Sequence, residues 1–158
     1  AVLKDGRPVA VKVQHRGLRE SARTDIATID LLVRALYWYN SAVNYLWLVE
    51  ETKLNLPREL DFRLEGKNAE RCSEVFASWD NVVAPHIYWE QTSSRVLCME
   101  YMDGCHVTEL DDLAAMRVSR HDVAKILCES FSHMTFVEGW VHCDPHEKNV
   151  KVRPMPGQ

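Results

Sequence analysis

Glycine and proline are scarce in this sequence, with six residues of each among 158. Charge of one sign is not in excess either, because 19 basic residues stand against 23 acidic ones and give a formal net charge of −4. This balance argues against a general nucleic-acid-binding protein, which would carry a basic surface, so we expect no nucleic-acid partner. With 46% apolar and 27% charged residues, the composition is typical of a folded domain and argues against disorder.

Cysteine is present without the spacing of a metal or redox motif. The five cysteines form an odd set that contains no Cys-x-x-Cys pair. We interpret them as reduced thiols of an intracellular protein that serve mostly in packing. They are Cys72, Cys98, Cys105, Cys128 and Cys143.

A hydrophobic run long enough to cross a membrane is also missing. The stretch at residues 35–49 carries no charge and holds five aromatic residues. It is too short, and too interrupted by Asn40, Ser41 and Asn44, to span a bilayer. Its aromatic side chains either pack within the domain or dock on a lipid or membrane surface. Packing within the domain is the favoured interpretation, because no basic face accompanies the aromatics.

A loop near the end of the chain, residues 139–152, carries the pattern around which the other elements can be arranged. Pro145 prevents a helix through its middle, and Asp144 and Asn149 lie five positions apart. In the kinase catalytic loop, an aspartate and an asparagine at this offset orient the attacking hydroxyl and help to hold a magnesium ion. The alternative is a turn in which both side chains only cap backbone groups.

The same loop contains three residues of types that bind metals: His142, Cys143 and His146. The two histidines are four residues apart, but Pro145 removes the helix that would aim both rings at one ion. The kinase-like interpretation of the loop is therefore favoured over a metal site.

Residues 3–14 near the start of the chain predict a β-hairpin. Asp5 and Gly6 provide a turn, and alternating valines follow it. Lys12 lies within Val-Ala-Val-Lys-Val, the pattern of the kinase strand whose lysine meets the nucleotide phosphates. A compact ammonium on a long stem suits that role. The alternative for Lys12 is a solvent-facing lysine on a strand.

Three helices are predicted after this hairpin. Residues 17–53 show apolar residues at helical spacing in two segments, and Pro57 is expected to open a third helix over residues 58–76. The third helix would gather the carboxylates of Glu59, Asp61 and Glu65 within two turns, where they repel one another unless a cation lies nearby. That cation is either a neighbouring basic residue of the helix, or Lys12 of the strand paired with Glu65.

Shorter patterns predict the remaining elements. Residues 85–89 and 95–100 indicate two strands joined by a polar turn, and residues 101–104 end the second strand at a glycine. An apolar stripe over residues 123–134 indicates a helix that runs on to Gly139, and residues 150–152 alternate as in a strand. The chain as a whole therefore predicts an α+β fold.

Four motifs, taken in this order along the chain, resemble the UbiB family, also called the aarF-domain-containing kinases, which are atypical protein-kinase-like proteins. They lie at residues 9–15, 59–69, 96–104 and 142–149. The resemblance implies an α+β, protein-kinase-like fold. Residues 1–102 would form a partial small lobe of antiparallel strands with inserted helices, and residues 103–158 would begin the helical lobe with its catalytic loop.

The resemblance also implies ATP or ADP and Mg²⁺ as cofactors, and a role for each matching residue. Lys12 would contact the nucleotide with Glu65 as its helix partner, and Asp144 would be the catalytic aspartate. The other implied residues are Glu59 and Asp61 near the nucleotide and metal, Glu100 and Met102 as main-chain contacts to adenine, and Asn149 as a magnesium ligand. The motif wording is most similar to that of the mitochondrial members, which implies a mitochondrial location and a link to ubiquinone or lipid metabolism.

Several departures from the family pattern leave a second interpretation open. Glu147 and Lys148 stand where the family usually has Pro-Gly, and Cys143 stands where ordinary kinases have arginine. No Asp-Phe-Gly triplet occurs in the 158 residues, which are too few for a complete two-lobed kinase. We therefore expect this chain to be part of a longer protein, and a pseudokinase-like binding or scaffold domain without turnover is the alternative to an enzyme.

Overall fold

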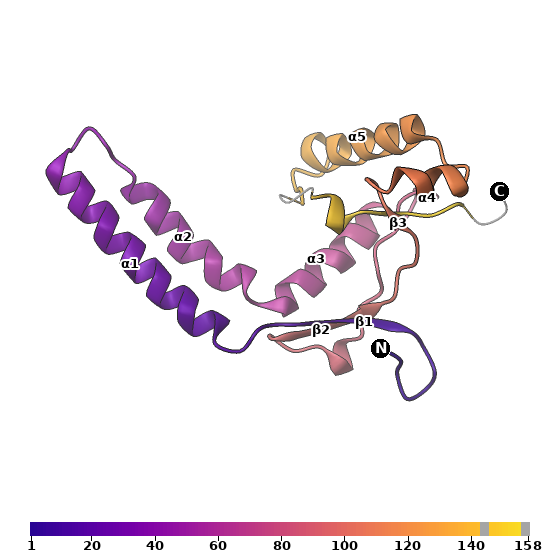
Figure 1. The fold of residues 1–158 in the computed structure, drawn as a ribbon, viewed down its shortest axis with the longest axis horizontal. Coiled ribbons are helices and arrows are strands. Elements are labelled where there is room, and N and C mark those ends of the chain that lie inside the picture. Colours follow the sequence, from indigo (N-terminus) through magenta and orange to yellow (C-terminus); the bar gives the residue numbers. More distant parts are fainter. Residues whose placement is uncertain (143–145, 156–158) are drawn as a thin grey trace.

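The computed structural model of the protein describes residues 1–142 and 146–155. A long two-helix hairpin leads away from a small sheet, and a second group of elements lies apart from this hairpin (Figure 1). The described residues form an α+β fold, as the sequence predicts. In chain order the elements are β1 (Val9–Val13), α1 (Leu18–Tyr39), α2 (Leu46–Glu59), α3 (Phe62–Val75), η1 (Trp89–Gln91), β2 (Val96–Glu100), β3 (Cys105–His106), α4 (Leu110–Ala115), α5 (Arg120–Phe136), η2 (Glu147–Asn149) and β4 (Lys151–Val152).

Strands β1 and β2 form a two-stranded antiparallel sheet in which Lys12 lies opposite Leu97. The chain enters β1 through the predicted turn at Asp5 and Gly6. Gly6 has a φ of 90°, and its N–H donates to the carbonyl oxygen of Leu3 at 2.9 Å. Glycine adopts a positive φ without steric penalty, so the residue type and the turn agree.

The predicted strand at residues 85–89 is wrong. Only Ile87 forms a bridge with β2, and it is an isolated one, while Trp89 already starts the short helix η1. The hydroxyl of Thr92 accepts a hydrogen bond from the N–H of Cys98 at 3.1 Å. This N–H is the donor that β2 would need to extend its pairing with residues 85–89. A side-chain bond to the backbone has replaced the strand pairing here, a competition that residue alternation does not reveal.

The buried core lies between β2 and α3. Its members are Phe62, Ile87 and Leu97, with Ala69 and Met99 packed against them. Residues directly opposite each other in an antiparallel pair share one face of the sheet. Lys12 is therefore on the same face as its buried partner Leu97, the face that α3 covers.

The boundary between α2 and α3 corrects the prediction for Pro57. Pro57 does not open a helix but lies in the last turn of α2. Helix α3 begins instead at Phe62, after Asp61, whose backbone is extended and whose carboxylate accepts a hydrogen bond from the N–H of Arg63 at 3.1 Å. An aspartate in this position satisfies one of the free donors at the start of a helix. This cap, rather than the first-turn preference of proline, sets the start of the helix.

A polar junction attaches the α1–α2 hairpin to the sheet. Arg19 of α1 donates to the carbonyl oxygens of Leu60 at 2.8 Å and Ser94 at 2.7 Å. Gln14, which follows β1 and is buried, donates to the same Leu60 oxygen at 3.0 Å and accepts from Arg19 at 3.2 Å. These bonds join three segments that are far apart in sequence, so they fix the direction in which the hairpin leaves the sheet.

The second group of elements is organised around β3 and β4, which pair antiparallel with His106 opposite Lys151. Strand β4 confirms the strand predicted at residues 150–152. Helix α5 confirms the predicted apolar helix, although it ends at Phe136 rather than at Gly139. Its partner strand β3 was not predicted, because two residues are too few to show alternation.

Replacing Gly104 by alanine is expected to destabilise the protein by about 2–4 kcal/mol. Gly104 has a φ of 113°, and a Cβ atom there would overlap the carbonyl oxygen of Val152 in β4. Urea unfolding of the variant and the wild type measures the loss. Gly6→Ala is the matched control, because Gly6 has a φ of 90° but a Cβ there meets nothing within 4 Å. Equal losses for the two variants would contradict the steric part of this prediction.

Candidate functional site

Lys12 of β1 and Glu65 of α3 form an ion pair that joins the sheet to the helix. The ammonium nitrogen of Lys12 donates to both carboxylate oxygens of Glu65, at 2.7 and 2.9 Å. It also lies 5.0 Å from the ring centre of Phe62. The two side chains keep 49% and 39% of their surface exposed, so a ligand in solution can reach them. The predicted pairing of Lys12 with Glu65 is thus present.

Local sequence explains why these two side chains meet. Lys12 faces α3 because its ladder partner Leu97 packs into the core beneath that helix. Phe62 anchors the first turn of α3 in the same core, and Glu65 lies one turn after the Asp61 cap. Residues four apart on a helix share one face, so the cap also sets the direction of Glu65.

Two other predicted site residues, Glu59 and Asp61, lie where α2 ends and α3 begins. Glu59 is the last residue of α2, and Asp61 spends one carboxylate oxygen on the N–H of Arg63. The structure therefore gives Asp61 a helix-capping role. Contact of either carboxylate with a nucleotide or metal stays a prediction.

The predicted adenine-contacting residues, Glu100 and Met102, lie at the end of β2 and just beyond it. The N–H of Glu100 donates to the carbonyl oxygen of His86 at 2.8 Å, and its carboxylate accepts from the N–H of His86 at 3.2 Å. The carbonyl oxygen of Met102 accepts from the ammonium of Lys151 at 3.2 Å. One of the two backbone positions predicted for the base is therefore bonded to a side chain of the same chain.

Sequence reasoning missed this contact between β4 and the segment after β2. Besides binding the Met102 carbonyl, Lys151 lies 5.6 Å from the ring centre of Tyr101, and Arg153 pairs with Asp103 at 2.9 Å. Lys151 of β4 and Arg153 just after it thus contact residues 101–103. The only signal in the sequence was that Lys151 and Arg153 alternate with valines. This alternation indicates a polar strand face, but it does not indicate which carbonyl oxygen that face contacts.

The predicted catalytic loop is described only in part. Asp144 and Cys143 lie outside the described residues, so the position of Asp144 relative to Lys12 stays a prediction. Asn149 ends the short helix η2, and its N–H donates to the carbonyl oxygen of His146 at 2.9 Å. The ring nitrogen Nδ1 of His146 accepts from the N–H of Lys148 at 3.2 Å, so this side chain caps η2.

The metal-site hypothesis for this loop gains no support from the part of the chain that the structure describes. Within residues 1–142 and 146–155, no group of three or more histidine, cysteine, aspartate or glutamate side chains could hold an ion together. Cys143, one of the three residues in that hypothesis, lies outside those ranges.

Helix α3 also contacts the segment that leads into the loop. The guanidinium of Arg71 lies 4.8 Å from the ring centre of Trp140, two residues before His142. At the end of the helix, the rings of Phe76 and Trp79 lie 6.0 and 5.3 Å from that of His133 in α5. One helix therefore carries Glu65 near its start and supports the approach to the loop near its end, which links the two predicted halves of the site.

Comparison with known protein families gives one match over nearly the whole chain. The family model described as the ABC1 atypical kinase-like domain matches residues 1–157. The chain is 44% identical over 156 residues to AarF domain-containing protein kinase 1 of Xenopus tropicalis. The aligned region covers 99% of this chain and 30% of that protein. It is also 44% identical over 156 residues to AarF domain-containing kinase 1 of Drosophila melanogaster, with the same coverage. The chain thus spans about a third of the length of these relatives.

Among solved structures, the chain is similar to that of Rv3197 from Mycobacterium tuberculosis in complex with erythromycin. The TM-score is 0.81 at 26% identity, and the match covers 98% of this chain and 39% of that one. With the family match, this likeness confirms the predicted α+β, protein-kinase-like fold.

Proposed function

The chain belongs to the ABC1 atypical kinase-like domain family, and from this premise we propose that it forms the nucleotide-binding part of an ATP-dependent kinase or ATPase. The observation that carries the proposal is the ion pair of Lys12 and Glu65, with both carboxylate oxygens of Glu65 within 2.9 Å of the ammonium. In protein kinases a strand lysine and a helix glutamate form such a pair when the lysine is placed to hold nucleotide phosphates.

Stability alone is a poor explanation for this pair. Ion pairs as exposed as this one contribute only about 0–1 kcal/mol, because water screens them and ordering two long side chains costs entropy. The pair nevertheless joins residues 53 positions apart and is supported by the buried Phe62 beneath it. The core therefore holds Lys12 and Glu65 in a fixed arrangement that adds little to the free energy of unfolding. Such an arrangement favours a role in binding.

The other proposed contacts follow the family motifs. Glu100 and Met102 would meet adenine through their main chains, and Asp144 would orient the hydroxyl or water that is attacked. The oxygen ligands of Glu59, Asp61 and Asn149 suit Mg²⁺, which prefers carboxylate and amide oxygens. When bound, this ion would neutralise charge on the phosphates.

The motif wording also supports a finer assignment. It rests on the resemblance of residues 59–69 and 142–144 to the mitochondrial UbiB members. We therefore propose a mitochondrial location and a role in ubiquinone or mitochondrial lipid metabolism for the full-length protein.

One observation favours a second candidate function, a pseudokinase-like domain that binds without turnover. Glu147 and Lys148 stand immediately before Asn149, where the family usually has Pro-Gly. The loop that should hold the metal has therefore gained a cation. This change is expected to affect turnover more than occupancy of the site.

Binding and turnover of Mg-ATP by the full-length protein separate these proposals. An ATP-dependent enzyme raises its melting temperature with Mg-ATP and releases phosphate or labels a substrate, whereas the pseudokinase-like domain gives the thermal shift alone. The absence of both a thermal shift and turnover at millimolar Mg-ATP would contradict nucleotide binding altogether.

A further inference from the structure

The free end of the α1–α2 hairpin is an uncharged surface rich in exposed aromatic side chains. Residues 35–49, which span the end of α1, the turn and the start of α2, contain no acidic or basic residue and no histidine. Trp38 and Tyr39 keep 88% and 84% of their surface exposed, and Tyr45 and Trp47 keep 51% and 64%. We call these four side chains the aromatic tip. The hairpin projects away from the sheet, and its turn lies at the far end (Figure 1).

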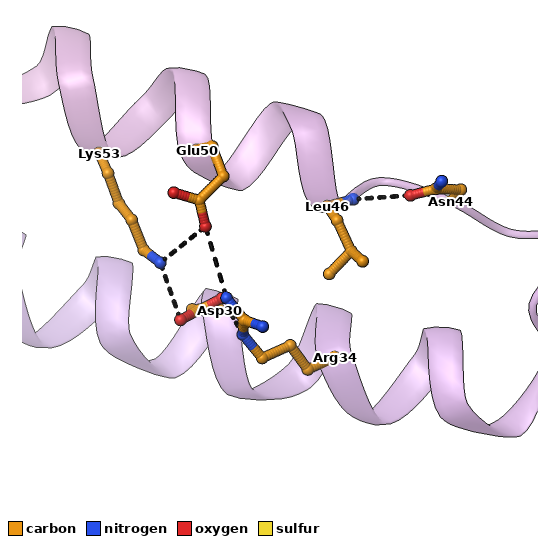
Figure 2. A network of polar contacts seen from close by, with 6 residues as sticks. All are labelled: Asp30, Arg34, Asn44, Leu46, Glu50 and Lys53. Carbon is orange, nitrogen blue, oxygen red and sulfur yellow. Dashed lines mark hydrogen bonds and ion pairs between the residues drawn. The ribbon is translucent and has the colours of Figure 1, made fainter.

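The turn behind the aromatic tip satisfies polar groups of its own backbone. The side-chain oxygen of Asn40 accepts from the N–H of Ala42 at 3.1 Å. The side-chain oxygen of Asn44 accepts from the N–H of Leu46 at 3.3 Å (Figure 2). The N–H of Asn40 itself donates to Leu36 at 2.8 Å. Unpaired backbone groups are costly to remove from water, so these internal bonds reduce the cost of moving the turn into an apolar environment.

A neutral charge cluster holds the two helices together just below the aromatic tip. Asp30 pairs with Arg34 at 2.7 Å and with Lys53 at 2.9 Å, and Glu50 pairs with the same two cations at 3.4 and 3.1 Å (Figure 2). The hydrogen bond from Lys53 lowers the pKa of Asp30, and the one to Asp30 raises the pKa of Lys53. Two acids and two bases cancel within this cluster, and the neighbouring Glu51 leaves residues 30–53 with a net charge of −1. The upper hairpin is therefore a preformed element with little charge to attract an acidic or basic partner.

We propose that the aromatic tip docks on a lipid bilayer and inserts into its interfacial region. Tryptophan and tyrosine are the residues enriched at membrane–water interfaces, where one end of the ring is apolar and the other meets water. A stable protein interface buries about 800 Å² on each side, and the end of a two-helix hairpin offers few residues for that. A deformable lipid surface is therefore the better match for the tip.

Charge matching determines which bilayer the aromatic tip would accept. The tip is uncharged, and residues 30–53 around it carry a net charge of −1, so anionic lipid does not attract this end of the hairpin. Zwitterionic phosphatidylcholine is therefore the matching surface, and insertion would be driven by apolar burial rather than by attraction between charges.

Exposed Ile29, Leu32 and Leu36 extend this apolar surface down one side of α1 and would allow a tilted approach. Among the helices that the structure describes, none is long and apolar enough to cross a membrane, so the proposal concerns surface docking.

Sedimentation of the full-length protein with phosphatidylcholine vesicles tests the proposal. The wild type is expected to bind, and Trp38→Ser combined with Trp47→Ser to weaken partitioning at least tenfold. Phe136→Ser is the matched control, because Phe136 is an aromatic residue 85% exposed on α5, away from the hairpin. It is expected to bind like the wild type. All three proteins should share one melting temperature, since the replaced side chains lie on the surface.

Four outcomes would overturn the proposal. The double variant could bind as tightly as the wild type, or the Phe136 variant could lose as much binding. Binding could require anionic lipid and disappear in high salt, which would indicate attraction between charges instead. Finally, acrylamide could fail to quench the fluorescence of Trp38 and Trp47 in the full-length protein without vesicles. Their fluorescence is obtained as the difference between the wild type and the double variant. Another part of the protein or a second copy would then cover the tip.

Discussion

Replacing Lys12 by methionine is expected to slow ATP turnover by the full-length protein about 100- to 1,000-fold, the usual loss when one charged or hydrogen-bonding group that stabilises a transition state is removed. Methionine keeps the apolar stem of the side chain and removes the ammonium, which is the proposed contact to the phosphates. It also leaves Glu65 without the partner that both of its oxygens contact. Steady-state phosphate release, with Mg-ATP affinity from a thermal-shift titration, measures the effect.

Lys67→Met is the matched control for this experiment. Lys67 is an exposed lysine of α3, two residues beyond Glu65, and no proposed contact depends on it. The Lys12 variant should also keep its fold, because a pair with 49% and 39% exposed side chains is expected to contribute less than about 1 kcal/mol to the free energy of unfolding. If both variants hydrolyse ATP at the wild-type rate, Lys12 is an ordinary strand lysine and the proposed site is wrong.

The features that could be predicted from the sequence are those that depend on residue type and short spacing. Asp5 and Gly6 specify a turn because glycine tolerates the positive φ found at Gly6. The pair of Lys12 and Glu65 was predictable from the kinase pattern of a strand lysine and a helix glutamate. The predicted crowding of three carboxylates on one helix is wrong, because only Glu65 of the three belongs to α3. The structure places the remaining carboxylates, Glu59 and Asp61, at the junction of α2 and α3.

The features that could not be predicted depend on competition between local signals or on contacts across the chain. Pro57 and Asp61 both mark helix starts, and α3 starts after the Asp61 cap with Phe62 of its first turn packed in the core. Lys151 reaches the carbonyl of Met102 only because β4 pairs with β3, a strand of two residues. Such a contact joins residues 49 positions apart, and no local pattern encodes the pairing that brings them together.

These two kinds of contact bear differently on function. The pair of Lys12 and Glu65 follows the family pattern and supports nucleotide binding. The bond from Lys151 to Met102 does not follow from that pattern, and it concerns a carbonyl proposed for adenine, so it bears on occupancy of the site and not on turnover. The enzyme and the pseudokinase-like domain would both bind nucleotide. They therefore differ most at the residue that would act in chemistry, which is Asp144.

Asp144→Asn is expected to slow ATP turnover about 100- to 10,000-fold, the range for loss of a positioned general base. Asparagine has nearly the same shape as aspartate but cannot accept a proton. The affinity for Mg-ATP should change much less than in the Lys12 variant, because the catalytic aspartate contacts the attacking group rather than the phosphates held by lysine. Phosphate release and a thermal-shift titration on the same samples separate the two effects.

The pattern across the variants then decides between the proposals. An ATP-dependent enzyme is expected to lose turnover in both Lys12→Met and Asp144→Asn. It is expected to lose affinity for Mg-ATP only in Lys12→Met. Turnover that survives Asp144→Asn would contradict the assigned role of this aspartate, since the spacing to Asn149 and the family motif would then mark only a capped turn. A wild type that binds Mg-ATP without turnover would instead favour the pseudokinase-like domain. In that case the Lys12 variant is expected to lose affinity for Mg-ATP, and Asp144→Asn is expected to change neither affinity nor turnover.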